Sequence, residues 1–329
     1  MSTSTHTRRA AEAPPPPPGR PVPGMALRTY RFLRFSVLAV IAALTTSLVI
    51  EIAETGCVQG SISAYYFTDA RSFFVGALVA IGLVMIVLWG KSPAEDGWLN
   101  LAGMLAPVVA FVPTTETADT RKCALETSSG ATVTSDRQEV AIVETAGRSA
   151  IDNNMLAYLV VIGLVLLAVL VRGLLAHRRT HEALVVDHPY AYWLPFGAAS
   201  ALWLFGVALF LEDGRTWLYD HAHMWSAILL FVCVVAAVIA IGFQKRNGER
   251  GGPPSRGWAR FYWWLAAAMT LGAGLVVLLS RAVFPDHVIL LLEAWMILGL
   301  AVFWVAQTID RWYDGAPTPA DTKAGTAGT

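Results

Sequence analysis

Charged residues are scarce in this chain: they make up 15% of its 329 residues, whereas 55% are hydrophobic. An ordinary soluble domain has about 25% charged residues, so the composition argues against a soluble globular protein. Lys plus Arg equals Asp plus Glu, at 24 each, and this balance gives no indication of nucleic acid or an acidic molecule as a partner. The positions of the charges are therefore more informative than their sum.

Long apolar runs are what the chain has in abundance. A helix needs roughly 20 mainly apolar residues to cross about 30 Å of hydrocarbon. The third run is the shortest and contains Pro107, so a re-entrant segment is the alternative there. The sequence predicts an all-α, polytopic transmembrane bundle of about eight spans. The candidate spans are Phe32–Ala53, Ser72–Trp89, Trp98–Val112, Met155–Val171, Tyr192–Leu211, His223–Phe243, Phe261–Ser280 and Val288–Gln307.

The positive charges predict how the bundle is oriented. With a cytoplasmic N-terminus and eight alternating helices, 17 of the 24 Lys and Arg residues lie on the cytoplasmic side. Cytoplasmic loops carry such an excess, so we expect both termini to be cytoplasmic and the protein to lie in the plasma (inner) membrane. The predicted organisation is a Pro-rich disordered tail over 1–27, a transmembrane domain over 28–312 with a long extracytoplasmic loop 114–154, and a disordered tail over 313–329.

Cysteine is rare, with three residues in the chain. By the predicted topology Cys57 and Cys123 lie in outer loops, while Cys233 lies inside the sixth span. Disulfides persist outside the cytosol, and these two share that compartment. We therefore predict a Cys57–Cys123 bridge, with two free thiols as the alternative.

Ionisable side chains within the spans are confined to the predicted outer half, where they count as functional candidates. Glu293 is the deepest acid, seven residues beyond Asp286, or roughly 10 Å at 1.5 Å per residue. It needs a partner, a proton or water, and we predict a contact with His223. The other ligand-binding candidates at this end are Glu51 and Glu54 on the first span, Ser61, Ser63, Tyr65 and Arg71 around the first loop, and Ser226 on the sixth span.

Several kinds of chemistry lack their usual sequence signals. There is no Gly-x-Ser-x-Gly nucleophile motif and no phosphate-binding glycine-rich motif. His221, His223 and His287 could form a zinc site at the rim, but the first two are about 200° apart around a helix. The sequence therefore names no metal, and the cofactors are unknown. Small residues such as Gly76 and Ala80, or Gly272 and Gly274, are interpreted as sites of close helix packing.

Short blocks of sequence carry a family resemblance. They are Ser61–Tyr66, Arg71–Leu78, parts of Asn100–Thr114, His221–Ala227 and parts of Glu293–Gln307. These blocks resemble a group of uncharacterised bacterial multi-pass membrane proteins, related at a distance to DRAM-type proteins and to the ceramidase and adiponectin-receptor-like superfamily. Resemblance to the hydrolases of the wider group would imply a zinc site of three histidines with a Ser and an Asp. No predicted span carries a His-x-x-x-His pair, so the resemblance implies a membrane fold and assigns no activity.

Three functions follow from these observations, and the sequence leaves all three open. The first is a protein with a polar pocket opening to the outer leaflet that binds or modifies a lipid or small amphipathic ligand. Glu293 and His223 would then act as catalytic acid and base. The second is a proton-coupled transporter using Glu293, although Gln307 is the main polar residue in the inner half of the spans. The third is a structural or partner protein without catalytic activity. Whether the chain is an enzyme is thus undecided, and no protein partner is indicated beside the lipid bilayer.

Overall fold

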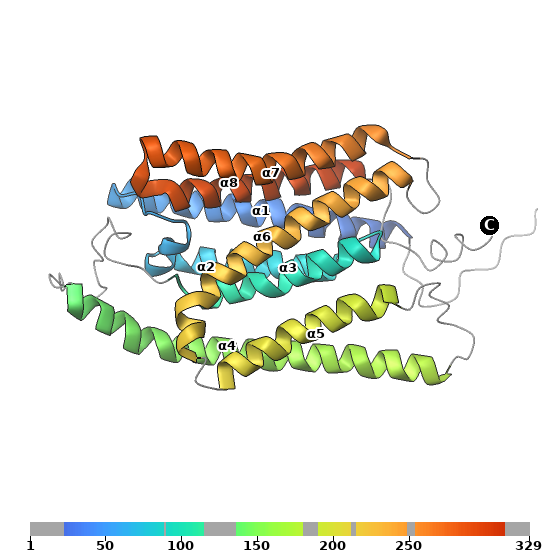
Figure 1. The fold of residues 1–329 in the computed structure, drawn as a ribbon, viewed down its shortest axis with the longest axis horizontal. Helices are drawn as coiled ribbons and strands as arrows, with labels where there is room; N and C mark the ends of the chain where they lie inside the picture. The colour runs from blue at the N-terminus through green and yellow to red at the C-terminus, as the bar shows by residue number, and fades with distance from the viewer. Residues whose placement is uncertain are drawn as a thin grey trace, which may run out of the picture.

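The chain folds into helices in the computed structural model, which describes residues 23–88, 90–114, 136–179, 190–211, 215–248 and 254–312. Within those ranges there is no β-strand. The helices run roughly along one long axis (Figure 1). In chain order they are α1 (Pro23–Thr55), the 3-10 helix η1 (Ser63–Phe67), α2 (Arg71–Val87), α3 (Pro93–Phe111), α4 (Asp136–Arg179), α5 (Tyr190–Leu211), α6 (Arg215–Asn247), α7 (Arg256–Val283), the 3-10 helix η2 (Pro285–His287) and α8 (Val288–Asp310).

Six of these helices, α1 and α4 to α8, are long and apolar enough to cross a membrane. α2 is also apolar but has 17 residues. The most apolar windows of α4 and α5 are only 11% and 6% buried, and large side chains such as Leu164, Leu194 and Phe205 are exposed there. Hydrocarbon is the solvent that suits such a surface, so the fold is compatible with a membrane-embedded helical bundle.

The described helices alternate in direction, so that the start of α1 and the end of α8 meet. The guanidinium of Arg31 donates two hydrogen bonds to the carbonyl of Trp312, at 2.9 and 2.6 Å. We call this end of the bundle, where Arg311 contacts Glu95, the Arg311 end. The opposite end, where Ser63 contacts Glu293, is the Glu293 end.

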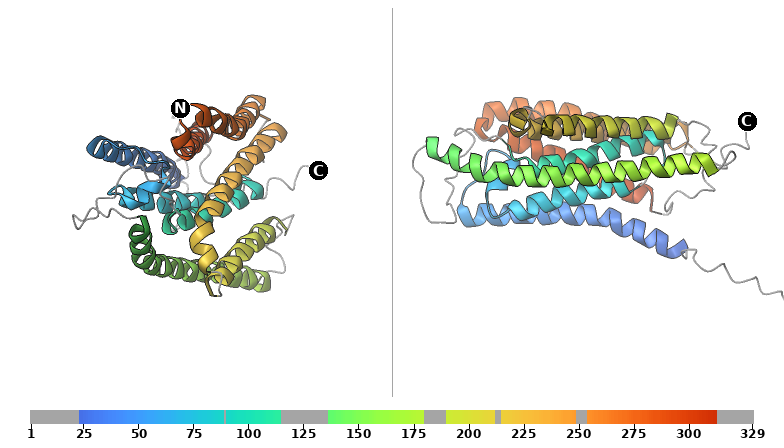
Figure 2. Two further views of the ribbon diagram at one scale, coloured as in Figure 1. Left: turned by 60° about the vertical axis from the view of Figure 1, so that its left-hand side comes forward. Right: turned by 90° about the horizontal axis from the view of Figure 1, so that it is seen from below.

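α3 lies at the centre of the bundle and packs against α2, α5 and α6. Pro107 does not interrupt this helix, which runs from Glu95 at the Arg311 end to Val112 beside His223 at the Glu293 end. The segment therefore does not turn back on itself. Figures 1 and 2 show α6 crossing obliquely between the paired helices α4 and α5 on one side and α1, α7 and α8 on the other.

Two glycines allow α2 and α3 to approach closely. A Cβ atom added at Gly82 would lie 2.7 Å from the carbonyl oxygen of Gly103, and one added at Gly103 would lie 2.6 Å from the carbonyl oxygen of Gly82. At Gly76 and Gly274 an added Cβ would meet no atom within 4 Å. The packing role predicted for those two glycines is therefore wrong. At Gly272 the prediction of close packing is confirmed, because an added Cβ would lie 2.5 Å from Trp295 Cζ2.

Two helix boundaries differ from the predicted ones. α1 begins at Pro23, inside the tail predicted over 1–27, and α4 begins at Asp136, inside the predicted loop 114–154. A helix satisfies its own backbone hydrogen bonds, so it can continue beyond the apolar run that a membrane requires. The remainder of both predicted tails, residues 1–22 and 313–329, lies outside the described residues.

The predicted Cys57–Cys123 bridge also extends outside the described residues, because Cys123 lies there. Cys57 is not a free thiol. Among the described residues the free cysteine is Cys233, and it is buried.

Candidate functional site

The connector between α1 and α2, residues 56–70, packs at the Glu293 end and carries η1. Within it the Ser61 hydroxyl oxygen accepts the N–H of Ala64 at 3.0 Å. The Tyr65 hydroxyl oxygen accepts the N–H of Gln59 at 3.3 Å. Tyr65 is 1% exposed, and this burial raises the pKa of its phenol. Ser61 and Tyr65, both predicted to bind a ligand, therefore hold the connector in shape.

Glu293 of α8 fastens this connector to the bundle. Its Oε2 accepts the backbone N–H groups of Ile62 at 2.5 Å and Ser63 at 3.3 Å, while its Oε1 lies 2.6 Å from Ser63 Oγ. The N–H of Leu290 adds a bond of 2.9 Å to the carbonyl of Gly60. The first N–H groups of a helix lack partners within it and favour a negative group, so the carboxyl of Glu293 caps η1 from another helix.

Ser63 also joins Glu293 to His223 of α6. Ser63 Oγ lies 2.9 Å from His223 Nε2 and 2.6 Å from Glu293 Oε1. His223 Nδ1 lies 2.7 Å from the carbonyl oxygen of Val112 at the end of α3. The sequence predicted that Glu293 and His223 meet at one end of the bundle. The structure brings them together there, with the Ser63 hydroxyl between them in place of a direct contact.

The remaining acidic and basic candidates of this end lie outside that arrangement. Glu51 is half-buried and Glu54 is exposed on α1, and neither forms a hydrogen bond with Glu293 or His223. The Arg71 guanidinium donates to the Tyr66 hydroxyl at 2.6 Å and stacks over its ring at 4.2 Å. Within the described residues Glu51, Glu54 and Arg71 thus form no hydrogen bond with Glu293, Ser63 or His223, and their predicted ligand contacts stay predictions.

The histidines proposed as a zinc alternative are not assembled into a site. His221 stacks on Trp217 with ring centroids 5.3 Å apart, whereas His223 is held by Ser63 and Val112. Among the described residues no three His, Cys, Asp or Glu side chains are placed to hold a metal ion, so His287 has no partners for that role.

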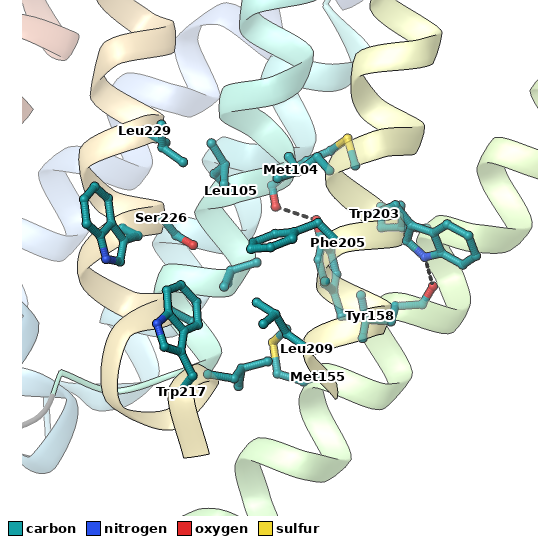
Figure 3. Close-up of a pocket in the computed structure, with 18 residues that line it drawn as sticks. Met104, Leu105, Met155, Tyr158, Trp203, Phe205, Leu209, Trp217, Ser226 and Leu229 are labelled. Atoms are coloured by element: carbon teal, nitrogen blue, oxygen red, sulfur yellow. Dashed lines mark hydrogen bonds between the residues drawn. The ribbon is translucent and has the colours of Figure 1, made fainter. Parts of the chain in front are cut away.

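A cavity of about 100 Å³ lies among α3, α4, α5 and α6. Its lining is almost entirely carbon, and two polar side chains in its wall form hydrogen bonds to backbone carbonyls. The Tyr158 hydroxyl donates to the Met104 carbonyl at 2.6 Å and the Trp203 indole N–H to the Leu159 carbonyl at 2.7 Å. Figure 3 shows the Ser226 hydroxyl pointing toward the cavity.

Ser226 is 7% exposed, and no residue within the described ranges forms a hydrogen bond with its hydroxyl. It was predicted to bind a ligand, and the structure places it in the cavity wall. Glu293 and His223 do not line this cavity, so their predicted catalytic action on a ligand there stays a prediction.

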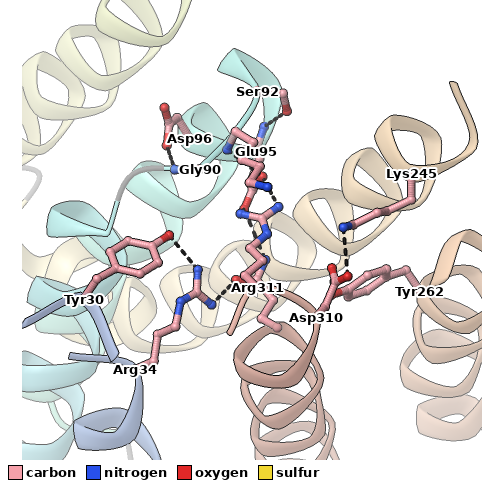
Figure 4. Close-up of polar contacts among 12 residues, drawn as sticks. Tyr30, Arg34, Gly90, Ser92, Glu95, Asp96, Lys245, Tyr262, Asp310 and Arg311 are labelled. Carbon is pink, nitrogen blue, oxygen red and sulfur yellow. Dashed lines mark hydrogen bonds and ion pairs between the residues drawn. The ribbon is translucent and has the colours of Figure 1, made fainter. Parts of the chain in front are cut away.

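A buried polar network occupies the Arg311 end (Figure 4). Two hydrogen bonds of 2.7 and 2.8 Å join the guanidinium of Arg311 to the carboxylate of Glu95. The side-chain amide of Gln307 donates to Glu95 at 3.1 Å and accepts from Arg34 at 2.7 Å. Beside it, Lys245 forms an ion pair of 2.8 Å with Asp310. These contacts fasten α1, α3, α6 and α8 to one another.

This network was not predicted from the sequence, because most of the charged residues that form it flank the spans on the predicted cytoplasmic side. For Arg34, the helical spacing could have predicted burial. Val37, Ile41 and Leu44 follow it at i+3, i+7 and i+10, so all four share one face of α1. All four side chains are buried. Gln307, interpreted from the sequence as the main polar residue in the inner half of the spans, is the link between Arg34 and Glu95.

No family model, curated protein or solved structure matches the chain. The geometry alone therefore carries the functional argument, and the family resemblance of the short blocks stays a prediction.

Proposed function

We propose that this chain is a multi-pass membrane protein that binds a hydrophobic ligand, such as the hydrocarbon chain of a lipid, in the cavity among α3, α4, α5 and α6. The apolar lining of that cavity is the observation that carries the proposal. An apolar cavity of comparable size, about 150 Å³, excludes water in a well-studied lysozyme variant and binds benzene. A space of about 100 Å³ suits one ring or the end of a chain.

The cavity walls also indicate where a ligand would come from. α4 and α5 form one side of the cavity and expose most of their remaining surface. A hydrophobic ligand dissolved in the bilayer would therefore meet these two helices first. The Ser226 hydroxyl points toward the cavity and can bind a hydroxyl or carbonyl of the ligand, so the proposed ligand class is amphipathic.

The proposed topology has eight crossings, with α2 and α3 completing the set, in the plasma membrane. The Arg311 end would then face the cytoplasm. The alternating directions of the described helices support this arrangement, and so does the excess of Lys and Arg in the loops at that end. The cavity-lining residues of α3, α5 and α6 come from the halves nearer the Glu293 end, and in the proposed topology this supports a position of the cavity toward the outer leaflet.

The experiment is photolabelling of the full chain in lipid nanodiscs with a fatty acid that carries a diazirine on its chain. Mass spectrometry should locate labelled peptides on α3 to α6. In Ala222→Phe a ring fills the cavity that Ala222 lines, so labelling there should fall several-fold. Ala168→Phe makes the same chemical change at an exposed position of α4 and should label like the wild type. Equal labelling of the cavity peptides in a folded Ala222→Phe protein would reject the proposal.

A further inference from the structure

The side chains of Glu293, Ser63 and His223 form one continuous hydrogen-bonded chain that connects α8, the connector and α6. Its links are 2.6 Å from Glu293 Oε1 to Ser63 Oγ and 2.9 Å from Ser63 Oγ to His223 Nε2. The chain ends at the Val112 carbonyl, 2.7 Å from His223 Nδ1. Ser63 and His223 are 5% and 7% exposed, so water does not replace these partners.

The donors and acceptors along this chain can be counted. A carbonyl oxygen only accepts, so Nδ1 of His223 must carry a hydrogen toward Val112. At the other end, Glu293 Oε2 accepts two backbone N–H groups and therefore carries none. Ser63 has a single hydroxyl hydrogen for two links. If Glu293 were ionised and His223 neutral, one of the two links would join two acceptors.

One added proton satisfies both links, in either of two arrangements. In the first, Glu293 is ionised, Ser63 donates to Oε1, and the protonated Nε2 of His223 donates to Ser63 Oγ. In the second, Oε1 of Glu293 is protonated and donates to Ser63 Oγ, and Ser63 donates to a neutral Nε2. The first becomes the second when the Nε2 proton moves to Ser63 Oγ and the Ser63 proton moves to Oε1. No atom is gained or lost, and the three side chains together stay uncharged.

A second added proton would not fit the same geometry. Glu293 and His223 would then both donate to Ser63 Oγ, which has two lone pairs to accept them. The Ser63 hydrogen would be left without an acceptor, because no other oxygen or nitrogen of the described residues is bonded to Ser63 Oγ. The site would also carry a buried positive charge, which is costly.

We propose that Glu293, Ser63 and His223 are a proton-binding site that holds one proton in common and exchanges protons as a unit. This site also fixes the connector, because Glu293 binds the Ile62 and Ser63 N–H groups while His223 binds α3. Removing the shared proton therefore breaks one link between the connector and the bundle, whereas adding a second proton leaves the Ser63 hydrogen without an acceptor. The proposal goes beyond ligand binding in the cavity and does not depend on it.

Other ionisable groups lie at the Glu293 end without joining the hydrogen-bonded chain. α3 and α5 contribute none in their described residues there. None of the neighbouring groups forms a hydrogen bond or ion pair with the three side chains. They are Glu51 and Glu54 of α1, Asp69 of the connector, Arg71 at the start of α2, Arg148 and Asp152 of α4, Arg215, Asp220 and His221 of α6, Arg281 of α7, and Asp286 and His287 of η2.

The test is a pH titration of the full-length protein in nanodiscs, with one probe at each end of the hydrogen-bonded chain. Nitrogen NMR of labelled histidine reports His223, assigned by its loss in His223→Gln. Infrared absorption of protonated carboxyl groups reports Glu293, assigned by its loss in Glu293→Gln. The titration covers roughly pH 4 to 9, a range that includes the ordinary pKa values of Glu and His side chains. Groups that share a proton titrate with midpoints that belong to the pair, so both probes should show the same midpoints in the wild type.

Three variants make the result decisive. Ser63→Ala removes the shared hydroxyl, so the two probes should separate to different midpoints. Ser61→Ala removes a hydroxyl that binds only the Ala64 N–H, so the common midpoints should persist. Glu293→Gln imitates the protonated acid, with its amide donating to Ser63, so His223 should stay neutral over the range in which the wild type exchanges its proton. This variant replaces Ser63→Ala if the latter does not fold. Different midpoints for the two probes in the wild type, or an unchanged His223 titration in Glu293→Gln, would overturn the proposal.

Discussion

Arg311 and Glu95 meet in the interior of the bundle through two parallel hydrogen bonds of 2.7 and 2.8 Å, and each residue is at most 1% exposed. The two residues are 216 positions apart in the chain. Their contact joins the end of α8 to the first turn of α3. A buried ion pair of this kind costs free energy to desolvate, but removing one partner leaves an uncompensated charge.

Glu95→Gln should therefore lower the free energy of unfolding by about 3–5 kcal/mol. The guanidinium of Arg311 would stay buried without its counter-charge. Thermal unfolding of the purified protein measures the effect. The double variant Glu95→Leu/Arg311→Met removes both charges and should be more stable than Glu95→Gln. A double variant less stable than the single one would show that the pair itself supplies net stability.

The close approach of α2 and α3 gives a second prediction. Gly103→Ala places a methyl group 2.6 Å from the Gly82 carbonyl oxygen and 2.7 Å from Ile86 Cγ1. Overpacking of this sort costs about 1–3 kcal/mol, so the melting temperature should fall. Gly76→Ala on α2 meets no atom within 4 Å and gains up to about 1 kcal/mol of helix propensity, so it should melt at or above the wild-type temperature. Equal effects of the two substitutions would contradict the described α2–α3 contact.

Ser226 gives a prediction about ligand chemistry. Ser226→Ala should weaken binding of a fatty alcohol by roughly 2- to 10-fold, the equivalent of about 0.5–1.5 kcal/mol for one neutral hydrogen bond. Binding of the alkane of the same length should not change, because it offers no hydrogen-bonding group. Ser280→Ala is the matched control, since the Ser280 hydroxyl donates to the Val276 carbonyl within its own helix at 2.6 Å. Competition of the alcohol and of the alkane against the photoreactive fatty acid measures their binding to the wild type and to both variants. A loss that is equal for alcohol and alkane would assign Ser226 to packing alone.

The eight-crossing topology predicts the sides of two short loops. A reporter inserted after Lys91, between α2 and α3, should lie in the cytoplasm, and one inserted after Thr114 should lie outside. α2 and α3 place these positions at opposite ends of the bundle. A reporter pair such as green fluorescent protein and alkaline phosphatase, each active on one side only, distinguishes the two sides. Finding both insertions on one side would mean that α3 does not cross.

The sequence allowed one half of the candidate site to be anticipated. Glu293 and His223 lie near the ends of apolar runs, and alternating helices bring those particular ends together, so their proximity follows from span order. Ser63 was recognised as a polar residue of the connector, but its place between them was not. Residues 56–70 have no helical or strand periodicity that fixes their path, and the path is set by Glu293 binding the start of η1.

The cavity and the Arg311-end network were harder to anticipate for different physical reasons. A cavity depends on how four helices fail to fill one space, and the apolar residues that line it, such as Met104 and Trp203, look like ordinary core residues in the sequence. Glu95 and Arg311 flank apolar runs, where charges normally face headgroups. Only the three-dimensional packing shows that both side chains turn inward.

A structure determined by electron cryomicroscopy, from protein extracted together with its native lipids, tests the central claim most directly. The account predicts elongated density among α3, α4, α5 and α6, with a polar atom within hydrogen-bonding distance of Ser226, and loss of that density in Ala222→Phe. A wild-type structure in which side chains fill this space and no density remains would contradict the proposal that this protein binds a hydrophobic ligand.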